Sequence, residues 1–325
     1  MKLQFDQIIP AISGCAKIFE KNERLYLHRF TDAQMEAYRS YSADFYKKTM
    51  ATAGVRLQFV TSSEQLTMTG ETVSASSRKF FAFDVYVNGA LVFHTLEGTD
   101  DTPTPYTLSV NLGKSEAKQV CVYFPWSAQT NIASLELDDG ASFEPYAKAY
   151  KMICFGDSIT HGYDARNPSF SYASRLADMM RADYINKGIG GEIFFPSLAA
   201  LKDPIEPDYI TVAYGTNDWS KSQKDVFERD AALFYAALSR NYPNTKIFAL
   251  APVWRKSYTD KKPIGAFSNV AKTLERIAAD LPNVTFVDCF DFIPHEEQYY
   301  APDVLHPNDA GFLLYATEVY KAITR

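Results

Sequence analysis

The chain has 325 residues, of which 46% are apolar and 22% charged, and its net charge is −6 at pH 7. This acidic balance argues against nucleic acid as a partner, because phosphate contacts need a basic surface. No apolar run reaches the roughly 18 residues that cross a membrane. The first 30 residues also lack the apolar core of a secretory signal, so we expect a cytoplasmic protein that does not bind membranes.

The cysteines are widely spaced and form no C-x-x-C pair. They stand at Cys15, Cys121, Cys154 and Cys289. Three of them lie in strand-like apolar segments, where a free cysteine behaves as a small hydrophobic residue. We therefore expect reduced thiols rather than disulfides or metal ligands.

Residues 53–143 read as a series of short strands, rich in Val, Phe, Tyr and Thr and separated by Gly, Asn and Asp. Asn88 and Gly89 stand between two such runs and predict a tight hairpin. Many short strands with regular turns favour an antiparallel β-sandwich or jelly roll. Although residues 31–49 carry a partly helical pattern, we expect residues 1–148 to form an N-terminal β-sandwich domain with a candidate role in substrate binding.

From residue 151 onward, short apolar runs alternate with helical patterns. Five strands are expected, over residues 151–155, 183–187, 209–214, 246–251 and 284–289. Helices are expected over residues 169–181, 222–240, 266–280 and 308–323. This alternation predicts an α/β domain with a five-stranded parallel sheet covered by helices on both faces. We place this second domain at residues 149–325.

Polar residues follow the predicted strands, at the edge where open parallel sheets bind their ligands. Ser158 follows the first strand, Gly191 the second and Asn217 the third. Asp303 and His306 lie beyond the fifth strand, three residues apart, so that one turn can bring the carboxylate to the imidazole. Acyl transfer needs such a set: a nucleophile, a base, a group that orients the base, and donors for the oxyanion.

Four short motifs follow one another in the second half of the chain. They are Gly-Asp-Ser-Ile at 156–159, a glycine at 191, Gly-Thr-Asn-Asp at 215–218 and Asp-Val-Leu-His-Pro at 303–307. Together they resemble the four sequence blocks of the SGNH, or GDSL-type, hydrolases, with Ile159 in place of the leucine of the family name. The resemblance covers roughly residues 150–325 and implies a flavodoxin-like, three-layer αβα catalytic domain.

The resemblance also implies roles for three of these side chains. Ser158 would be the nucleophile, His306 the general base, and Asp303 the residue that orients His306. Asp309 or a backbone carbonyl stays open as the alternative to Asp303. No metal ion or organic cofactor is implied, because the chemistry runs through the serine alone.

An oxyanion hole is implied in the same way. Its donors would be the backbone N–H groups of Ser158 and Gly191 and the side-chain amide of Asn217. The glycines cluster at this point, so Gly188 and Gly190 stay open as alternatives to Gly191.

Several residues near the motifs have two alternative roles. The aromatic residues are candidates for an acyl or sugar pocket, with core packing as the alternative, and they are Tyr163, Phe194, Trp219 and Trp254. We interpret Asp157 and Asp218 as structural hydrogen-bonding groups. His161 is expected at the surface or at the rim of the pocket.

Other classes of function fit less well. A dinucleotide site needs G-x-G-x-x-G, but Ile193 stands at the last glycine position. The nucleophile elbow of an α/β-hydrolase needs G-x-S-x-G, but Thr160 stands at its end. A two-metal phosphoesterase would need more histidines than the 5 present. A carbohydrate-binding protein with an inactive hydrolase domain stays open as an alternative.

The N-terminal half is similar in architecture to the β-sandwich domains that precede SGNH domains in some bacterial carbohydrate esterases. We therefore expect a serine esterase that removes short acyl groups, above all acetyl, from a carbohydrate through an acyl-serine intermediate. The sequence has no long apolar stretch that would form a lipid lid. Lipase, thioesterase or peptide-conjugate esterase activity at the same site stays open, and the sequence predicts no oligomeric state.

Overall fold

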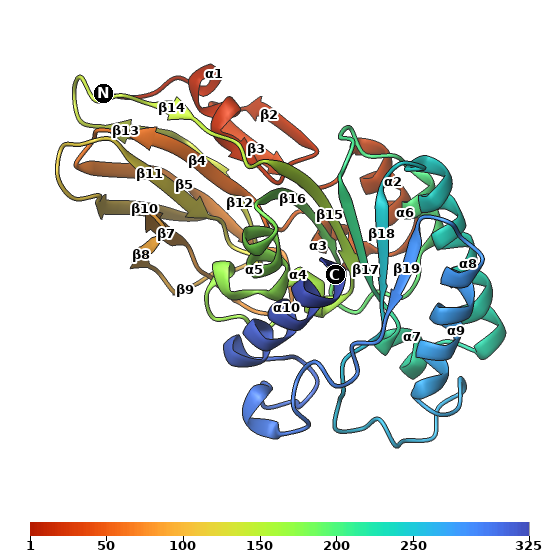
Figure 1. Cartoon of the computed structure of the whole chain (residues 1–325). Helices are drawn as coiled ribbons and strands as arrows, with labels where there is room; N and C mark the ends of the chain where they lie inside the picture. The colour runs from red at the N-terminus through yellow and green to blue at the C-terminus, as the bar shows by residue number, and fades with distance from the viewer. Residues whose placement is uncertain (325) are drawn as a thin grey trace.

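The structure is a computed structural model that describes residues 1–324, and its strands form two groups that lie side by side (Figure 1). The N-terminal group consists of two antiparallel sheets of six strands each, and the C-terminal group is one parallel sheet of five strands. Both architectures agree with the fold class expected from the sequence.

The two antiparallel sheets pack face to face. In spatial order the first contains β1 (Ile12–Ser13), β4 (Arg56–Thr61), β11 (Lys118–Tyr123), β7 (Asp84–Val87) and β8 (Ala90–His94), with β14 (Glu144–Pro145) paired to β4. The second contains β10 (Thr104–Asn111), β5 (Gln65–Ser74), β12 (Ala128–Ile132), β3 (Arg24–His28) and β2 (Lys17–Lys21), with β13 (Ser134–Leu137) paired to β5. A separate ribbon joins β6 (Phe80–Phe81) to β9 (Glu97–Gly98).

Alternating side chains build the core of this sandwich. Leu66 and Met68 on β5 point inward together with Leu108 on β10, and all three are 0–1% exposed. Residues between them along each strand face outward, as expected for a sheet with one buried face. Asn88 and Gly89 both have positive φ and join β7 to β8, which confirms the predicted hairpin.

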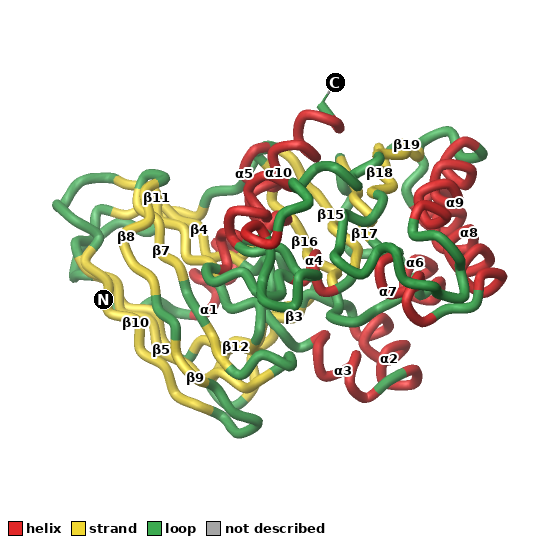
Figure 2. Tube along the Cα trace, turned by 90° about the horizontal axis from the view of Figure 1, so that it is seen from below, coloured by secondary structure: helices red, strands yellow, loops and turns green. Residues whose placement is uncertain are grey.

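The parallel sheet forms the middle of a three-layer αβα domain (Figure 2). Its strands in spatial order are β16 (Ala182–Gly188), β15 (Tyr150–Gly156), β17 (Tyr209–Ala213), β18 (Lys246–Leu250) and β19 (Val284–Val287). One face is covered by α5 (Tyr172–Met179) and α10 (Asp309–Ile323), and the other by α6 (Pro196–Ala200), α8 (Lys224–Asn241) and α9 (Ser268–Ala279).

Strand β15 shows why this sheet is buried on both faces. Met152 and Cys154 pack toward α5 and α10, whereas Ile153 and Phe155 pack toward α8 and α9. All four side chains are 0–1% exposed. A continuous apolar run is what a central parallel strand requires, because successive side chains enter opposite cores.

Two helices from the N-terminal half belong by packing to the C-terminal half. These are α2 (Asp32–Tyr41) and α3 (Ala43–Thr49), which lie side by side in Figure 2, and α2 contacts α6. Met35 and Tyr38 of α2 share one hydrophobic core with Leu198 of α6. The division of the chain at residue 148 therefore stays a proposal, because the αβα layer is completed by residues that precede it.

The remaining elements are short. They are α1 (Phe5–Ile8), α4 (Ser158–His161), α7 (Thr216–Lys221) and three 3₁₀ turns (Ile9–Ala11, Pro168–Phe170 and Glu297–Tyr299). Across residues 1–324, every helix is too short or too polar to cross a membrane. All four cysteines are free thiols.

Candidate active site

Ser158 is placed where β15 ends and α4 begins. Asp157 is the N-cap residue of α4, and its carboxylate accepts the Ile159 backbone N–H at 3.0 Å. A side chain at Gly156 would put its Cβ 2.8 Å from the Ala213 carbonyl oxygen, so only glycine fits at the end of the strand. Because Ser158 is the first residue of a helix, its own N–H has no acceptor within that helix.

Three side chains from distant segments form one chain of hydrogen bonds. The Ser158 Oγ lies 2.8 Å from His306 Nε2, and His306 Nδ1 lies 2.6 Å from Asp303 Oδ2. With a proton on Nδ1, the imidazole donates to Asp303 and accepts from the serine hydroxyl. This is the arrangement of nucleophile, base and orienting carboxylate that activates a serine.

A tight turn fixes Asp303 against His306. The Asp303 Oδ1 accepts the backbone N–H groups of Leu305 and His306, each at 3.0 Å. Val304, which lies between Asp303 and Leu305 in this turn, has φ +47°, a conformation that β-branched residues rarely adopt. Such strain persists only where the surrounding structure holds it, and it is typical of functional sites.

The Asp303 carboxylate is an anion in this setting. Burial by itself would raise the pKa of Asp303, but hydrogen bonds from the His306 side chain and from the His306 and Leu305 backbone lower that pKa well below its ordinary value. A negative charge is therefore ready to stabilise an imidazolium when His306 takes up a proton.

A second carboxylate, which the sequence reasoning missed, lies at the same imidazole nitrogen. The Asp164 Oδ2 is 3.3 Å from His306 Nδ1. Asp164 in turn accepts two hydrogen bonds from Arg78, at 2.8 and 2.6 Å. Asp309, the alternative considered above, instead accepts the backbone N–H of Arg166. The only sequence signal for Asp164 is its place six residues after the serine, and Arg78 has none.

The candidate oxyanion donors differ in whether they are already engaged. Gly188 and Gly190 donate their N–H groups to the side chains of Asn186 and His161, at 2.8 and 3.3 Å. Gly191 has φ +85°, and its N–H makes no hydrogen bond to residues 1–324. The Nδ2 of Asn217, in the first turn of α7, is buried and has no acceptor in that same span. Gly191 and Asn217 are therefore available as donors, together with the Ser158 N–H at the start of α4.

The aspartates of the first and third motifs hold the loops that carry these donors. Asp157 caps α4, and Asp218 accepts the backbone N–H of Phe194 at 3.0 Å. Burial raises the pKa of Asp157 to about 6 and that of Asp218 to about 7. Both are placed as structural groups rather than as bases for the serine.

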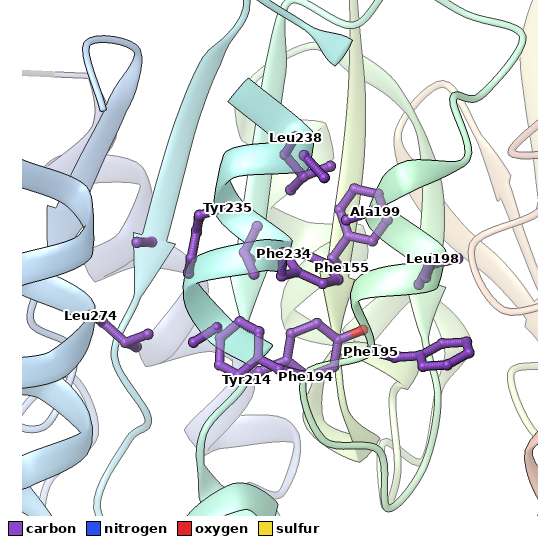
Figure 3. Close-up of a cluster of buried hydrophobic side chains, with 14 of the residues drawn as sticks. Phe155, Phe194, Phe195, Leu198, Ala199, Tyr214, Phe234, Tyr235, Leu238 and Leu274 are labelled. Atoms are coloured by element: carbon purple, nitrogen blue, oxygen red, sulfur yellow. The ribbon is translucent and has the colours of Figure 1, made fainter. Parts of the chain in front are cut away.

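The four candidate pocket aromatics are placed very differently. Tyr163 stacks on His306 at 5.7 Å between ring centres, and Trp254 stacks on His295 at 5.2 Å. Phe194 lies instead in the core, packed on Tyr214 (Figure 3). Trp219 is fully buried, with its indole N–H donated to a backbone carbonyl. Phe194 and Trp219 therefore pack in the core rather than on a pocket wall.

The expectation for His161 needs correction, because its side chain is fully buried. Its Nδ1 accepts the Gly190 N–H, and its Nε2 lies 2.8 Å from the Trp126 carbonyl oxygen, to which it donates. Burial holds the pKa of His161 well below its ordinary value, so the ring is neutral. This histidine fixes the glycine loop to the sandwich.

The chain is similar in sequence to one known protein family and in structure to several solved proteins. Residues 154–314 match the model of the GDSL-like lipase/acylhydrolase family. Proteins of curated function give no match. Salicylyl-acyltransferase SsfX3 from a tetracycline biosynthetic pathway is similar in structure, with a TM-score of 0.84 at 22% identity over 97% of this chain and 94% of that one.

Two further solved structures share the fold. A protein described as a GDSL-like lipase from Bacteroides ovatus has a TM-score of 0.78 at 18% identity, over 100% of this chain and 97% of that one. A family two carbohydrate esterase from Clostridium thermocellum, in complex with cellohexaose, has a TM-score of 0.67 at 18% identity, over 84% and 93%. The family match covers the segments that hold Ser158, Asn217 and His306, and the chain therefore carries a domain of the GDSL-like lipase/acylhydrolase family.

Proposed function

We propose that this protein is a serine esterase that hydrolyses short acyl esters, with acetyl groups on a carbohydrate as the substrate class. One observation carries the chemistry: the Ser158 hydroxyl, the His306 imidazole and the Asp303 carboxylate form a continuous hydrogen-bonded chain. A merely structural serine needs no such base and no second partner behind it.

The reaction runs in two halves. His306 Nε2 takes the proton of Ser158 as its Oγ attacks the ester carbonyl carbon, and the same proton then goes to the leaving alcohol. Water, deprotonated by His306, next attacks the acyl-serine, and the acid leaves as Ser158 regains its proton. In each tetrahedral intermediate the oxyanion would accept hydrogen bonds from the Ser158 and Gly191 N–H groups and the Asn217 amide, each worth about 3 kcal/mol of barrier.

A hollow further along the same edge of the parallel sheet supports the carbohydrate part of the proposal. It has a volume of about 500 Å³ and is lined by three aromatic residues and three carboxylates, namely Tyr258, Phe267, Phe290, Asp260, Asp288 and Asp291. Its walls follow β18 and β19, two and three strands away from β15, or roughly 10–14 Å. Aromatic faces combined with hydrogen-bond acceptors suit a sugar ring, which has apolar faces and hydroxyl edges.

The test of the chemistry is hydrolysis of p-nitrophenyl acetate by the wild type and by Ser158→Ala. We expect clear turnover by the wild type and loss of at least about a thousandfold in the variant, because the acyl-serine cannot form. An inactive wild type, or full activity in Ser158→Ala, would contradict the proposal and favour a binding protein with an inactive hydrolase domain.

The test of the substrate compares acyl and alcohol parts separately. Turnover of acetyl, butyryl and octanoyl p-nitrophenyl esters shows which acyl length is preferred, and a preference for octanoyl would favour a lipase.

The Tyr258→Ala variant tests the alcohol part. It should raise KM for an acetylated oligosaccharide by about tenfold and leave KM for p-nitrophenyl acetate unchanged, since only the larger substrate reaches the hollow.

Acyl transfer to an alcohol is the second candidate, and the full-length likeness to an acyltransferase favours it. Both reactions share the acyl-serine and differ in whether water or an alcohol attacks it. Product analysis with added sugar alcohols distinguishes them, because a transferase yields a new ester and a hydrolase yields free acid.

A further inference from the structure

Arg78 connects the β-sandwich to the surroundings of the candidate catalytic residues. This residue lies between β5 and β6, and its backbone is held in place by two hydrogen bonds with the Ser76 hydroxyl, each of 3.0 Å. Its guanidinium donates from Nε and Nη2 to the two carboxylate oxygens of Asp164, at 2.8 and 2.6 Å. This paired geometry fixes both the position and the plane of the carboxylate.

Asp164 is held in an orientation that it would not keep by itself. Its φ of +68° lies in the left-handed region, and its carboxylate is 18% exposed. The neighbouring Ala165 carbonyl accepts the Trp126 indole N–H at 2.9 Å, so a second hydrogen bond connects this loop to the sandwich. Tyr163, on the same loop, stacks on His306 and lies under the Arg78 guanidinium.

The positive charge of Arg78 offsets the negative charges of the two carboxylates beside His306. The oxygen and nitrogen atoms that Asp164, Asp303 and His306 present to one another all lie within 4.8 Å. Two carboxylates so close repel, and together they favour the protonated imidazole, which cannot act as a base. The Arg78 Nη2 is 2.6 Å from Asp164 and 4.0 Å from Asp303, so one positive charge offsets the pair.

We propose that Arg78 and Asp164 are positioning residues for His306. Arg78 holds the Asp164 carboxylate beside the imidazole and offsets the negative charge of the two carboxylates. The β-sandwich is thereby part of the catalytic machinery rather than an accessory domain. This inference rests on the proposed esterase function, since it assigns His306 the role of base.

The test is the pH dependence of kcat/KM for p-nitrophenyl acetate. The charged and titratable groups that face His306 are Arg78, Asp157, Asp164, Asp303 and Tyr163. In Arg78→Gln, kcat/KM should fall about tenfold and the acid limb should move up by about 0.5–1 pH unit, because a positive charge is lost. In Asp164→Asn, the acid limb should move the opposite way.

Two further variants separate the contributions. Arg78→Lys keeps the charge but not the paired geometry, so we expect a lower rate with a nearly unchanged acid limb. Lys79→Gln removes the adjacent charge, which pairs with Asp101 on the surface, and should leave both rate and profile as in the wild type. A profile that is the same in Arg78→Gln, Asp164→Asn and the wild type would overturn the proposal.

A second readout does not depend on turnover. The chain has 5 histidines, so the His306 ring resonance can be assigned by its loss in His306→Gln and followed by NMR against pH. Its titration midpoint should rise in Arg78→Gln and fall in Asp164→Asn. If the wild type hydrolyses no ester but these midpoints move, the proposed function fails and the positioning role stands. If the wild type is active and the midpoints stay fixed, the positioning role fails alone.

Discussion

Asn217 carries a side-chain amide that lowers the stability of the folded protein and fits the proposed reaction. Its Nδ2 is buried and makes no hydrogen bond to any of residues 1–324. A buried donor without an acceptor costs free energy in the folded state. Such a donor is retained where a ligand or a reaction intermediate supplies the acceptor, which fits the role proposed for Asn217 at the oxyanion.

Replacing Asn217 by Ala should therefore separate activity from stability. We expect kcat for p-nitrophenyl acetate to fall about a hundredfold or more with little change in KM, because the amide acts on the intermediate. The melting temperature should stay equal or rise. Asn269→Ala is the matched control, since the Asn269 amide is already bonded to the Ile264 carbonyl. A loss of melting temperature in Asn217→Ala with unchanged kcat would refute this role.

At the scale of elements, Glu192 joins three segments behind the glycine loop. Its two carboxyl oxygens accept the hydroxyls of Tyr38 on α2 and Tyr214 just after β17. Glu192 is only 1% exposed. Burial outweighs both hydrogen bonds and raises the pKa of Glu192 from its ordinary value of 4.5 to about 8. The loop that carries Gly191 is thus anchored by a carboxyl that is largely neutral at pH 7.

This anchoring predicts a pH-dependent stability. Folded Glu192 holds its proton more tightly than the unfolded chain does, so its contribution is complete below pH 4.5 and is lost as the pH rises toward 8. The Glu192→Gln variant does not lose stability in this way as the pH rises, because a glutamine side chain does not titrate. From pH 5.5 to 7.5 the free energy of unfolding of the variant should gain about 2 kcal/mol relative to the wild type.

Urea unfolding at the two pH values measures this gain. Glu318→Gln, on the half-exposed side of α10, is the control and should show no such difference. A constant offset between Glu192→Gln and the wild type across this pH range would show that Glu192 does not titrate there.

At the scale of the whole molecule, the two halves are joined by buried polar contacts as well as apolar ones. Arg29 is fully buried and donates to the carbonyls of Asn186 and Gly188 at the end of β16. Arg56 of the sandwich, also fully buried, pairs with Asp178 at 3.0 Å. Removing either half would leave these groups without partners and would uncover the core shared by α2 and α6.

We therefore expect the intact protein to unfold in a single calorimetric transition. A fragment of residues 149–325 should lack a cooperative transition, because α2, α3 and Arg78 are missing from it. Two well-separated transitions in the intact protein, or a native-like fragment, would contradict this coupling. Calorimetry and proteolysis of both forms provide the measurement.

Much of the C-terminal half could be predicted from local patterns. The five strands and four long helices follow from apolar runs and helical periodicity, and Ser158, Gly191 and Asn217 each lie just beyond a strand end. The β7–β8 hairpin follows from Asn88-Gly89. Helices α2 and α3 show the limit: their helical pattern is visible, but the surface on which they pack is not. His161 was misplaced for the same reason, since its partners lie in other segments.

The sequence by itself determined where the candidate residues lie, because strand periodicity sends Ser158, Gly191, Asn217 and the Asp303–His306 turn to one edge of a parallel sheet. Only the tertiary structure decided which charged neighbours surround those residues. Arg78 is 80 residues before Ser158 and belongs to another sheet system, and no local pattern marks it for the site. Propensity and periodicity act over a few residues, whereas a charge acts through space on whatever folding places beside it.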